Sequence, residues 1–129
     1  MNDYVLTAAE WSVMECLWDH SPRSGREAVE YLSAGVGWSR STTLTMLRRM
    51  DEKGLITSCE DADGIRVYSP NIDREDATMQ QTEDFLHRIY HGSIGMMLSA
   101  FTKKQSLSQK EIDELYAILD NVKEGTQHE

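Results

Sequence analysis

The sequence predicts a mainly α-helical fold with a small two-stranded β wing, followed by a C-terminal helical segment that dimerises. Three amphipathic segments with helix-start signals occupy the chain up to Gly54. Two short runs rich in β-branched residues then flank an Asp-Gly pair. Beyond Pro70 the pattern is wholly helical, in a segment too short to bury its own apolar stripes.

The first helix is expected to begin at Thr7. Thr7 and Glu10 form a capping box, in which each side chain satisfies a backbone N–H of the other residue. The apolar residues from Trp11 to Trp18 recur with helical spacing and give one broad apolar face. Pro22 follows shortly, so the helix should end before it.

The second helix repeats the start signal. Ser24 and Glu27 form another capping box. The apolar residues through Leu32 should face inward, and we expect Gly35 and Gly37 to break the helix.

The third helix should run from about Ser41 to Lys53, with Gly54 as its C-cap. At 100° per residue its side chains separate into two faces. The face that suits a core comprises Thr43, Met46, Leu47 and Met50. The opposite face, mostly short and polar and ending in an arginine, comprises Ser41, Leu44, Thr45 and Arg48.

A β hairpin follows the third helix. Residues 55–59 and 65–69 read as strands, and Asp63-Gly64 is a strong turn signal because glycine accepts the positive φ of a tight turn. Pro70 should stop the second strand. Three helices and a hairpin in this order predict a winged helix–turn–helix domain over residues 1–71.

The remaining chain should form helices. Asp73 can cap a helix that continues to about Tyr90, where Gly92 ends it. Ser108 and Glu111 form a further capping box at the start of the last helix. Between them lies a second short amphipathic stretch.

We predict that residues 72–124 are a dimerisation region and that residues 125–129 are a disordered tail. Packing against the first domain is the alternative for the apolar stripes, but the short link after the wing favours a second copy. A twofold dimer would also suit DNA binding, because it places the two copies of the third helix on two half-sites of a DNA duplex. The predicted dimerisation residues are Met79, Leu86, Ile89, Ile94, Met97, Leu98, Phe101, Ile112, Leu115, Leu119 and Val122.

The net charge of −9 at pH 7 speaks against DNA as a partner, because affinity for DNA comes largely from neutralised phosphates. Residues 36–56, however, carry four basic and two acidic side chains, whereas residues 73–129 carry six basic and eleven acidic ones. The acidic residues are thus concentrated away from the third helix, and we expect specific, salt-sensitive DNA binding.

Several side chains of the third helix and the wing are candidates for DNA contact. Thr45 can hydrogen-bond a base edge or a phosphate, and Arg48 can reach guanine or the backbone. The alternative is that Ser41, Thr42 and Thr45 only cap the helix or lie on its solvated surface. The remaining candidates are basic, and each is either a phosphate contact or an ordinary surface cation: Arg40, Arg49, Lys53 and, on the wing, Arg66.

No metal, cofactor or catalytic site is expected. Cys16 and Cys59 suit a buried position and a strand, and two cysteines make neither a disulfide framework nor a zinc site. His87 and His91 have the i, i+4 spacing of metal ligands, but no Glu or Cys completes a motif, so a polar helix face is the better interpretation. We find no nucleophile–base pair, phosphate loop or paired carboxylates.

A cytoplasmic protein without direct membrane binding is expected. No apolar run approaches the ~20 residues that a membrane-spanning helix needs. The start, Met1-Asn2-Asp3-Tyr4, lacks the basic and apolar stretches of a secretory signal.

The order and spacing of several segments resemble the penicillinase-repressor family, of the BlaI, MecI and CopY type. The resemblance extends from Leu6 to about Val122. It is carried by Leu6-Thr7-Ala8-Ala9-Glu10-Trp11, Val13-Met14, Leu17-Trp18, Trp38-Ser39, residues 42–50 with Arg49, Lys53-Gly54-Leu55-Ile56 and Tyr68-Ser69-Pro70.

The resemblance implies a homodimeric repressor of double-stranded operator DNA, on an inverted repeat that commonly has TACA and TGTA arms. Leu44 departs from the basic or polar residue usual in the family, and its apolar side chain could touch a thymine methyl. The operator of this protein should therefore differ from that of the family.

The family's β-lactam-responsive branch implies a membrane sensor with a metalloprotease domain, which triggers cleavage of an Asn–Phe bond in the dimerisation region. That bond aligns with Ala100-Phe101, where Phe101 matches and Ala100 departs. Phe101 as an aromatic of the dimer core is the alternative. The copper-responsive branch has a cysteine-rich tail, and no cysteine follows Cys59, so copper sensing by that route is disfavoured.

Two other functions fit the pattern. A MarR-like regulator would release DNA when a small molecule fills a pocket between the first helix and the C-terminal helices. A winged-helix adaptor would bind proteins and no DNA, which the net charge favours and the threonine and arginine stripe opposes. Salt-dependent DNA binding separates the adaptor from the repressor.

Overall fold

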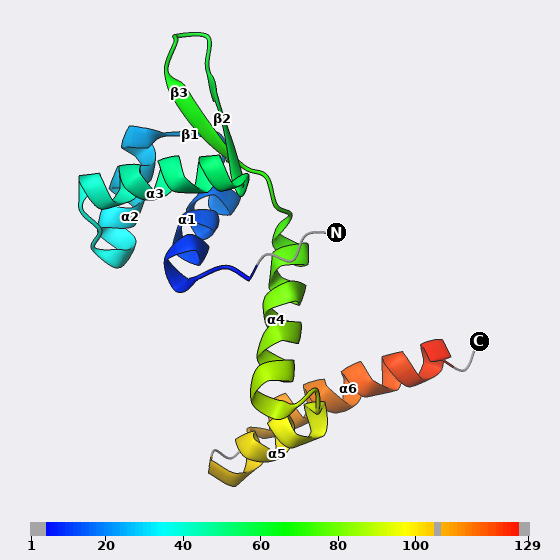
Figure 1. Ribbon diagram of the computed structural model, residues 1–129. Coiled ribbons are helices and arrows are strands. Elements are labelled where there is room, and N and C mark those ends of the chain that lie inside the picture. The colour runs from blue at the N-terminus through cyan, green and yellow to red at the C-terminus, as the bar shows by residue number, and fades with distance from the viewer. Residues whose placement is uncertain (1–4, 105–106, 127–129) are drawn as a thin grey trace. The chain divides into compact units, whose positions relative to one another are not determined.

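The computed structural model of the protein describes residues 5–104 and 107–126. It divides into two compact units, Met1–Asp84 and Phe85–Glu129. The first unit contains three helices and a small sheet, with the β hairpin extending beyond the helices (Figure 1).

The helices of the first unit are α1 (Ala8–Asp19), α2 (Gly25–Val36), α3 (Arg40–Lys53) and the beginning of α4 (Arg74–Tyr90). Both predicted capping boxes at the first two helices are confirmed. Thr7 Oγ1 accepts from the Glu10 N–H at 3.1 Å, and the Glu10 carboxylate accepts from the Thr7 N–H at 2.9 Å. Ser24 and Glu27 repeat this geometry at 3.1 and 2.8 Å. Sequence-local signals therefore fix where these helices begin.

Of the two glycines predicted to break the second helix, only Gly37 does so. Gly35 lies inside α2, and the helix ends at Gly37, whose φ of +73° is the left-handed conformation that favours glycine. Helix α3 begins at Arg40 with Ser39 as N-cap, one residue before the predicted start, and ends at Gly54 with φ +82°. On its predicted core face Thr43, Leu47 and Met50 are buried, and Met46 is half-buried against the core.

The sheet has three antiparallel strands instead of the predicted two: β1 (Arg23–Ser24), β2 (Ile56–Glu60) and β3 (Arg66–Pro70), in the order β1-β3-β2. The hairpin was predicted, whereas β1 was missed. A two-residue strand has no alternation to detect; it forms because Arg23 and Ser24 pair with Tyr68 and Val67.

Both the backbone and the side chain of Asp61 close the hairpin turn. Asp61 Oδ1 accepts from the N–H groups of Asp63 and Ile65 at 2.9 and 3.0 Å, and Gly64 adopts φ +76°. The predicted Asp-Gly signal therefore marks the turn correctly.

The core of the first unit lies between α1, α2, α3 and the base of the sheet, and it extends to the first turn of α4. Its buried apolar side chains are Leu6, Val13, Met14, Cys16, Leu17, Ala28, Leu32, Leu47, Met50, Leu55, Ile56 and Ala77. Burial raises the pKa of the Cys16 thiol to about 11, so Cys16 is an inert part of this core.

The first unit reaches beyond the boundary predicted at residue 71. Ala77 on α4 is buried, and Gln81 Oε1 accepts from the Leu6 N–H at 3.1 Å. The compact unit accordingly ends at Asp84. Isolated helix periodicity gave no sign that the first three turns of α4 belong to the winged-helix core.

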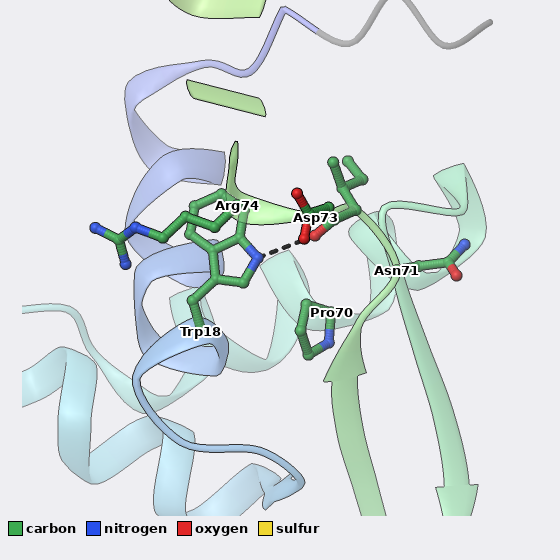
Figure 2. A pocket seen from close by; sticks show the side chains of 6 residues that line it. Trp18, Pro70, Asn71, Asp73 and Arg74 are labelled. Carbon is green, nitrogen blue, oxygen red and sulfur yellow. Dashed lines mark hydrogen bonds between the residues drawn. The ribbon is translucent and has the colours of Figure 1, made fainter. Parts of the chain in front are cut away.

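The link from the wing to α4 packs on Trp18 (Figure 2). Trp18 Nε1 donates to the Ile72 carbonyl at 3.0 Å, and the Arg74 guanidinium lies 5.4 Å from the Trp18 ring centroid. Arg74 also pairs with Glu15 at 3.2 Å. These contacts attach the start of α4 to α1.

The second unit comprises the end of α4, then α5 (Ile94–Lys104) and α6 (Gln109–Thr126). Ser108 and Glu111 form the predicted capping box, with hydrogen bonds of 3.1 and 2.9 Å. The predicted tail is corrected at its start, because Gly125 and Thr126 continue α6, and residues 127–129 lie outside the described residues. Among the described residues from 85 onward, none is buried.

Within the described ranges, no helix has the length and apolarity required to cross a bilayer.

Candidate nucleic-acid interface

The outward face of α3 presents short polar side chains at its N-terminal end. Ser39 Oγ accepts from the Thr42 N–H at 3.2 Å and lies 3.0 Å from Thr42 Oγ1 and 3.3 Å from Ser41 Oγ. Ser41 and Thr42 are exposed, and Thr45 is half-buried. Their hydroxyls form a polar ledge that can accept and donate hydrogen bonds.

Three arginines on the same helix carry unpaired charge. Arg40, Arg48 and Arg49 are exposed, and none of them has a hydrogen bond or ion pair with the residues that the structure describes. Guanidinium groups free of protein partners suit phosphate oxygens and guanine edges, because each offers two parallel N–H donors.

Leu44 lies on this face but is half-buried. It packs at the edge of the core, and a Cβ placed on Gly25 would lie 3.3 Å from Leu44 Cδ2. Leu44 therefore fixes the distance between α3 and the start of α2, and only part of its side chain is left to touch another molecule.

Two predicted DNA contacts have protein partners. Lys53 is paired with Glu10 of α1. Arg66 Nη1 donates to Ser58 Oγ at 2.8 Å, and Ser58 Oγ donates to Asp51 Oδ2 at 2.7 Å. Ser58 thus joins the wing to the end of α3, and Arg66 supports it from the neighbouring strand with a side chain that is still exposed.

Sequence reasoning did not single out Arg26, the residue after Gly25, which itself lies against Leu44 of α3. Arg26, in the first turn of α2, is 87% exposed and has an i, i+4 pair with Glu30 at 3.7 Å, which contributes little at such exposure. A cation in the first turn of a helix is unfavourable to the helix dipole, so its position was an available signal for a role outside the fold. Arg40 has the same unfavourable placement in α3.

Arg23, by contrast, is committed to the fold. Its Nε donates to the Cys16 carbonyl at 3.0 Å, its Nη2 pairs with Asp19 at 2.9 Å, and its guanidinium lies 4.8 Å from the Tyr31 ring centroid. Arg23 therefore satisfies the last turn of α1 instead of reaching outward.

The predicted dimerisation residues lie along α4, α5 and α6 with large apolar exposure. Met79, Ile94 and Leu119 are 57%, 59% and 58% exposed. Leu86, Met97, Leu98, Ile112 and Leu115 are half-buried, and Ile89, Phe101 and Val122 are exposed. Four further apolar side chains are exposed in the second unit and were not among the predicted residues: Phe85, Met96, Tyr116 and Ile118.

The histidines and cysteines that the structure describes do not gather into a metal site. Across residues 5–104 and 107–126, no three His, Cys, Asp or Glu side chains converge as ligands. His91 has φ +53° and lies in the turn that ends α4, next to Gly92 at φ +86°.

A three-helix core, a β hairpin and an outward helix with free arginines define a winged-helix protein of the nucleic-acid-binding class. The family model described as penicillinase repressor matches residues 6–121. The chain is 36% identical over 118 residues to the penicillinase repressor of Bacillus licheniformis, covering 92% of this chain and 91% of that protein. It is 30% identical over 117 residues to the methicillin resistance regulatory protein MecI of Staphylococcus aureus (strain N315), covering 91% and 94%. The chain belongs to the penicillinase repressor family.

A solved structure supports the fold. The solution structure of the Bacillus licheniformis BlaI monomeric form in complex with the blaP half-operator matches with a TM-score of 0.52 and 35% identity, over 58% of this chain and 90% of that one. The winged-helix prediction is confirmed. As a member of this family the protein is a transcriptional repressor and not an enzyme, which the sequence also predicted.

Proposed function

We propose that this protein is a homodimeric repressor that binds an inverted-repeat operator, with α3 in the major groove of each half-site. The observation that carries the proposal is the outward face of α3, where Arg40, Arg48 and Arg49 have no partner within the described chain. The matching BlaI domain in complex with its half-operator supports the same use of this domain.

Each candidate side chain has a specific role in the proposal. Thr45 and Arg48, one turn apart on the exposed side of α3, read base edges. Ser41, Thr42, Arg40 and Arg49 contact phosphates and set the register of the helix. Arg66 borders the minor groove from the wing, and the exposed edge of Leu44 approaches a thymine methyl. We propose TACA- and TGTA-like arms that differ where Leu44 replaces a polar residue.

Apolar exposure in the second unit supports the homodimer. Phe101, Tyr116 and Leu119 are 52%, 65% and 58% exposed, on a unit with no buried residue among those described. Burial of such side chains against a second copy is worth about 25 cal/mol per Å² of apolar area. A symmetric pair of α4–α6 segments would supply the core that one copy lacks.

Relief of repression is proposed to follow an inducing signal, with a membrane sensor protease as the candidate partner. The bond between Ala100 and Phe101 lies within α5, where Ala100 is half-buried and Phe101 exposed. A protease needs an extended segment, so cleavage here would require α5 to unfold locally. Purified sensor protease and wild-type repressor, followed by mass spectrometry, would show whether cuts fall at this bond.

The ligand-responsive alternative has a hollow of about 460 Å³ beside α1, lined by Thr7, Ala8, Trp11, Thr78, Gln81 and Thr82. It is open to solvent, whereas a small-molecule site usually encloses most of its ligand. The hollow therefore gives this alternative no specific support.

The proposal is tested by fluorescence anisotropy with DNA from upstream of the protein's own gene, random DNA as competitor and a salt series. The Thr45→Ala, Arg48→Ala variant should bind at least about 30-fold more weakly, because two base-reading contacts are each worth about 1–3 kcal/mol. The Lys110→Ala variant is the matched control, since it also removes an exposed cation but on α6, outside the unit that carries α3.

Tight, competitor-resistant binding that the double substitution abolishes would support α3 as the reading helix. An absence of binding even at low salt would overturn the repressor proposal in favour of the adaptor. Equal loss of affinity for operator and random DNA would reassign Thr45 and Arg48 to phosphate contact.

A further inference from the structure

The last turn of α3 is tied to the first turn of α1 by one ion pair. Lys53 Nζ donates to Glu10 Oε2. The Glu10 side chain is 9% exposed, whereas that of Lys53 is 57% exposed. Among the residues that the structure describes, this nearly buried carboxylate therefore has one cationic partner, which reaches it from the protein surface.

Glu10 is shared between two helices. Its Oε1 accepts from the Thr7 N–H at 2.9 Å as part of the α1 cap, while its Oε2 takes the Lys53 ammonium. Burial acts to raise the pKa of Glu10, but hydrogen bonds from Lys53 and Thr7 outweigh it and hold the pKa below 4.5. The carboxylate is thus ionised at neutral pH and needs a cation beside it.

This arrangement gives Lys53 a different role from its neighbours on α3. Arg48 and Arg49 are free to contact DNA, whereas turning Lys53 toward DNA would leave the Glu10 carboxylate buried and without its cation. Removing one partner of a buried ion pair is costly, because the remaining charge loses both water and its counter-ion.

The end of α3 has a second polar contact on its other side. Asp51 Oδ2 accepts from Ser58 Oγ at 2.7 Å, which ties the same turn to strand β2. With Met50 and Leu47 buried beneath it, α3 would stay folded and attached if the contact with α1 were lost, but its end would be held from the wing side alone.

We propose that Lys53 is a positioning residue that, with Glu10, fixes the C-terminal end of α3 on α1 and so sets the angle at which α3 enters the major groove. This inference rests on the proposed DNA binding through α3. It removes Lys53 from the set of phosphate contacts and adds Glu10, on the core side of the domain, to the residues that govern affinity.

The Glu10→Gln variant separates the two roles of Lys53 by the sign of its effect. The glutamine oxygen can still accept from the Thr7 N–H, so the cap of α1 is kept. If Lys53 contacted phosphate, freeing it and removing a negative charge would tighten operator binding. If Lys53 positions α3, the same substitution weakens binding, by roughly 3- to 30-fold for a residue that acts without touching the DNA.

The Lys53→Met variant should weaken binding to a similar extent and leave the salt dependence unchanged. A lost phosphate contact would instead reduce the slope of log K against log salt by about 0.9. The Glu10→Gln, Lys53→Met double variant should be no weaker than either single one, because both remove the same contact. Lys53→Arg should recover most of the affinity.

Glu52→Gln is the matched control, since Glu52 is an exposed neighbour of Lys53 on the same helix. It should bind DNA as tightly as the wild type or slightly more tightly. Anisotropy with the operator duplex gives the affinities, and thermal melting confirms that each variant is folded at the assay temperature.

Tighter or unchanged binding by Glu10→Gln, or a reduced salt slope in Lys53→Met, would overturn the proposal. If the wild type itself bound no DNA, the proposed function would fail, and amide hydrogen exchange would still test the anchor. Glu10→Gln and Lys53→Met should each speed amide exchange in the last turn of α3. Unchanged exchange there would show that the ion pair does not anchor this turn.

Discussion

The two units of the chain begin their helices with the same signals, yet they treat their apolar side chains in opposite ways. In the first unit Val13, Leu17 and Leu47 are each 0% exposed. In the second, Ile94, Tyr116 and Leu119 are 59%, 65% and 58% exposed. Helix signals therefore show where each helix begins, and burial shows which unit is complete by itself.

The difference divides the work of the molecule. A closed core holds α3 and the wing as a rigid surface, and that surface needs no second copy to form. In the proposed dimer the open second unit would gain its core by pairing, and its stability would then depend on protein concentration. Affinity for a two-half-site operator would then depend on the second unit, whereas the reading of each half-site depends on the first.

Truncating one leucine to alanine in each unit should give the largest difference between the two units. Leu17→Ala should lower the free energy of unfolding by about 2–5 kcal/mol at any protein concentration, because it opens a cavity in a closed core. Leu119→Ala should leave the melting of the first unit unchanged and raise the dimer dissociation constant. Thermal melts over a concentration series, with analytical ultracentrifugation, measure both effects.

Concentration-independent destabilisation by Leu119→Ala would mean that one copy buries this leucine by itself. That result would contradict the open character of the second unit and remove the main support for the homodimer.

Truncation should sharpen the boundary between the units. A chain of residues 1–84 should fold as a monomer with a concentration-independent melting temperature. A chain of residues 1–71 should be less stable by about 2 kcal/mol, because it loses the buried Ala77 and the Gln81 hydrogen bonds to Leu6. Equal stability of the two chains would place the boundary at the earlier position.

Much of the fold follows from local sequence. The capping boxes at Thr7, Ser24 and Ser108 lie where the sequence placed them, because each depends on two side chains three residues apart. Strand β1 and the extent of the first unit did not follow, because they depend on long-range pairs such as Arg23 with Tyr68 and Leu6 with Gln81.

The candidate site divides in the same way. The periodicity of α3 placed Thr45 and Arg48 on the outward side, since a single helix fixes that relation. It could not separate Arg48 from Lys53, because the difference is a partner on another helix, Glu10. Periodicity also could not show that Leu44 is half-buried, because its neighbour Gly25 belongs to another helix.

The capping boxes offer the smallest and most closely matched comparison between the units. The backbone N–H of Ser24, with its hydroxyl, lowers the pKa of Glu27 from 4.5, and Ser108 does the same for Glu111. A depressed pKa contributes stability above pH 4.5, and that contribution is lost as the pH falls through the folded-state value. Glu27→Gln should therefore flatten the acid-induced loss of stability in the melting of the first unit.

Glu111→Gln should leave that melting unchanged and flatten the acid dependence of dimer dissociation instead. Ser24→Ala and Ser108→Ala should each cost about 1 kcal/mol in the same two readouts, because each leaves a helix N-terminus uncapped. NMR titration of the two carboxyl groups checks the direction of the pKa shifts. If both caps altered only the melting of the first unit, α6 would not belong to the surface that pairs, and the dimer would have to form through α4 and α5.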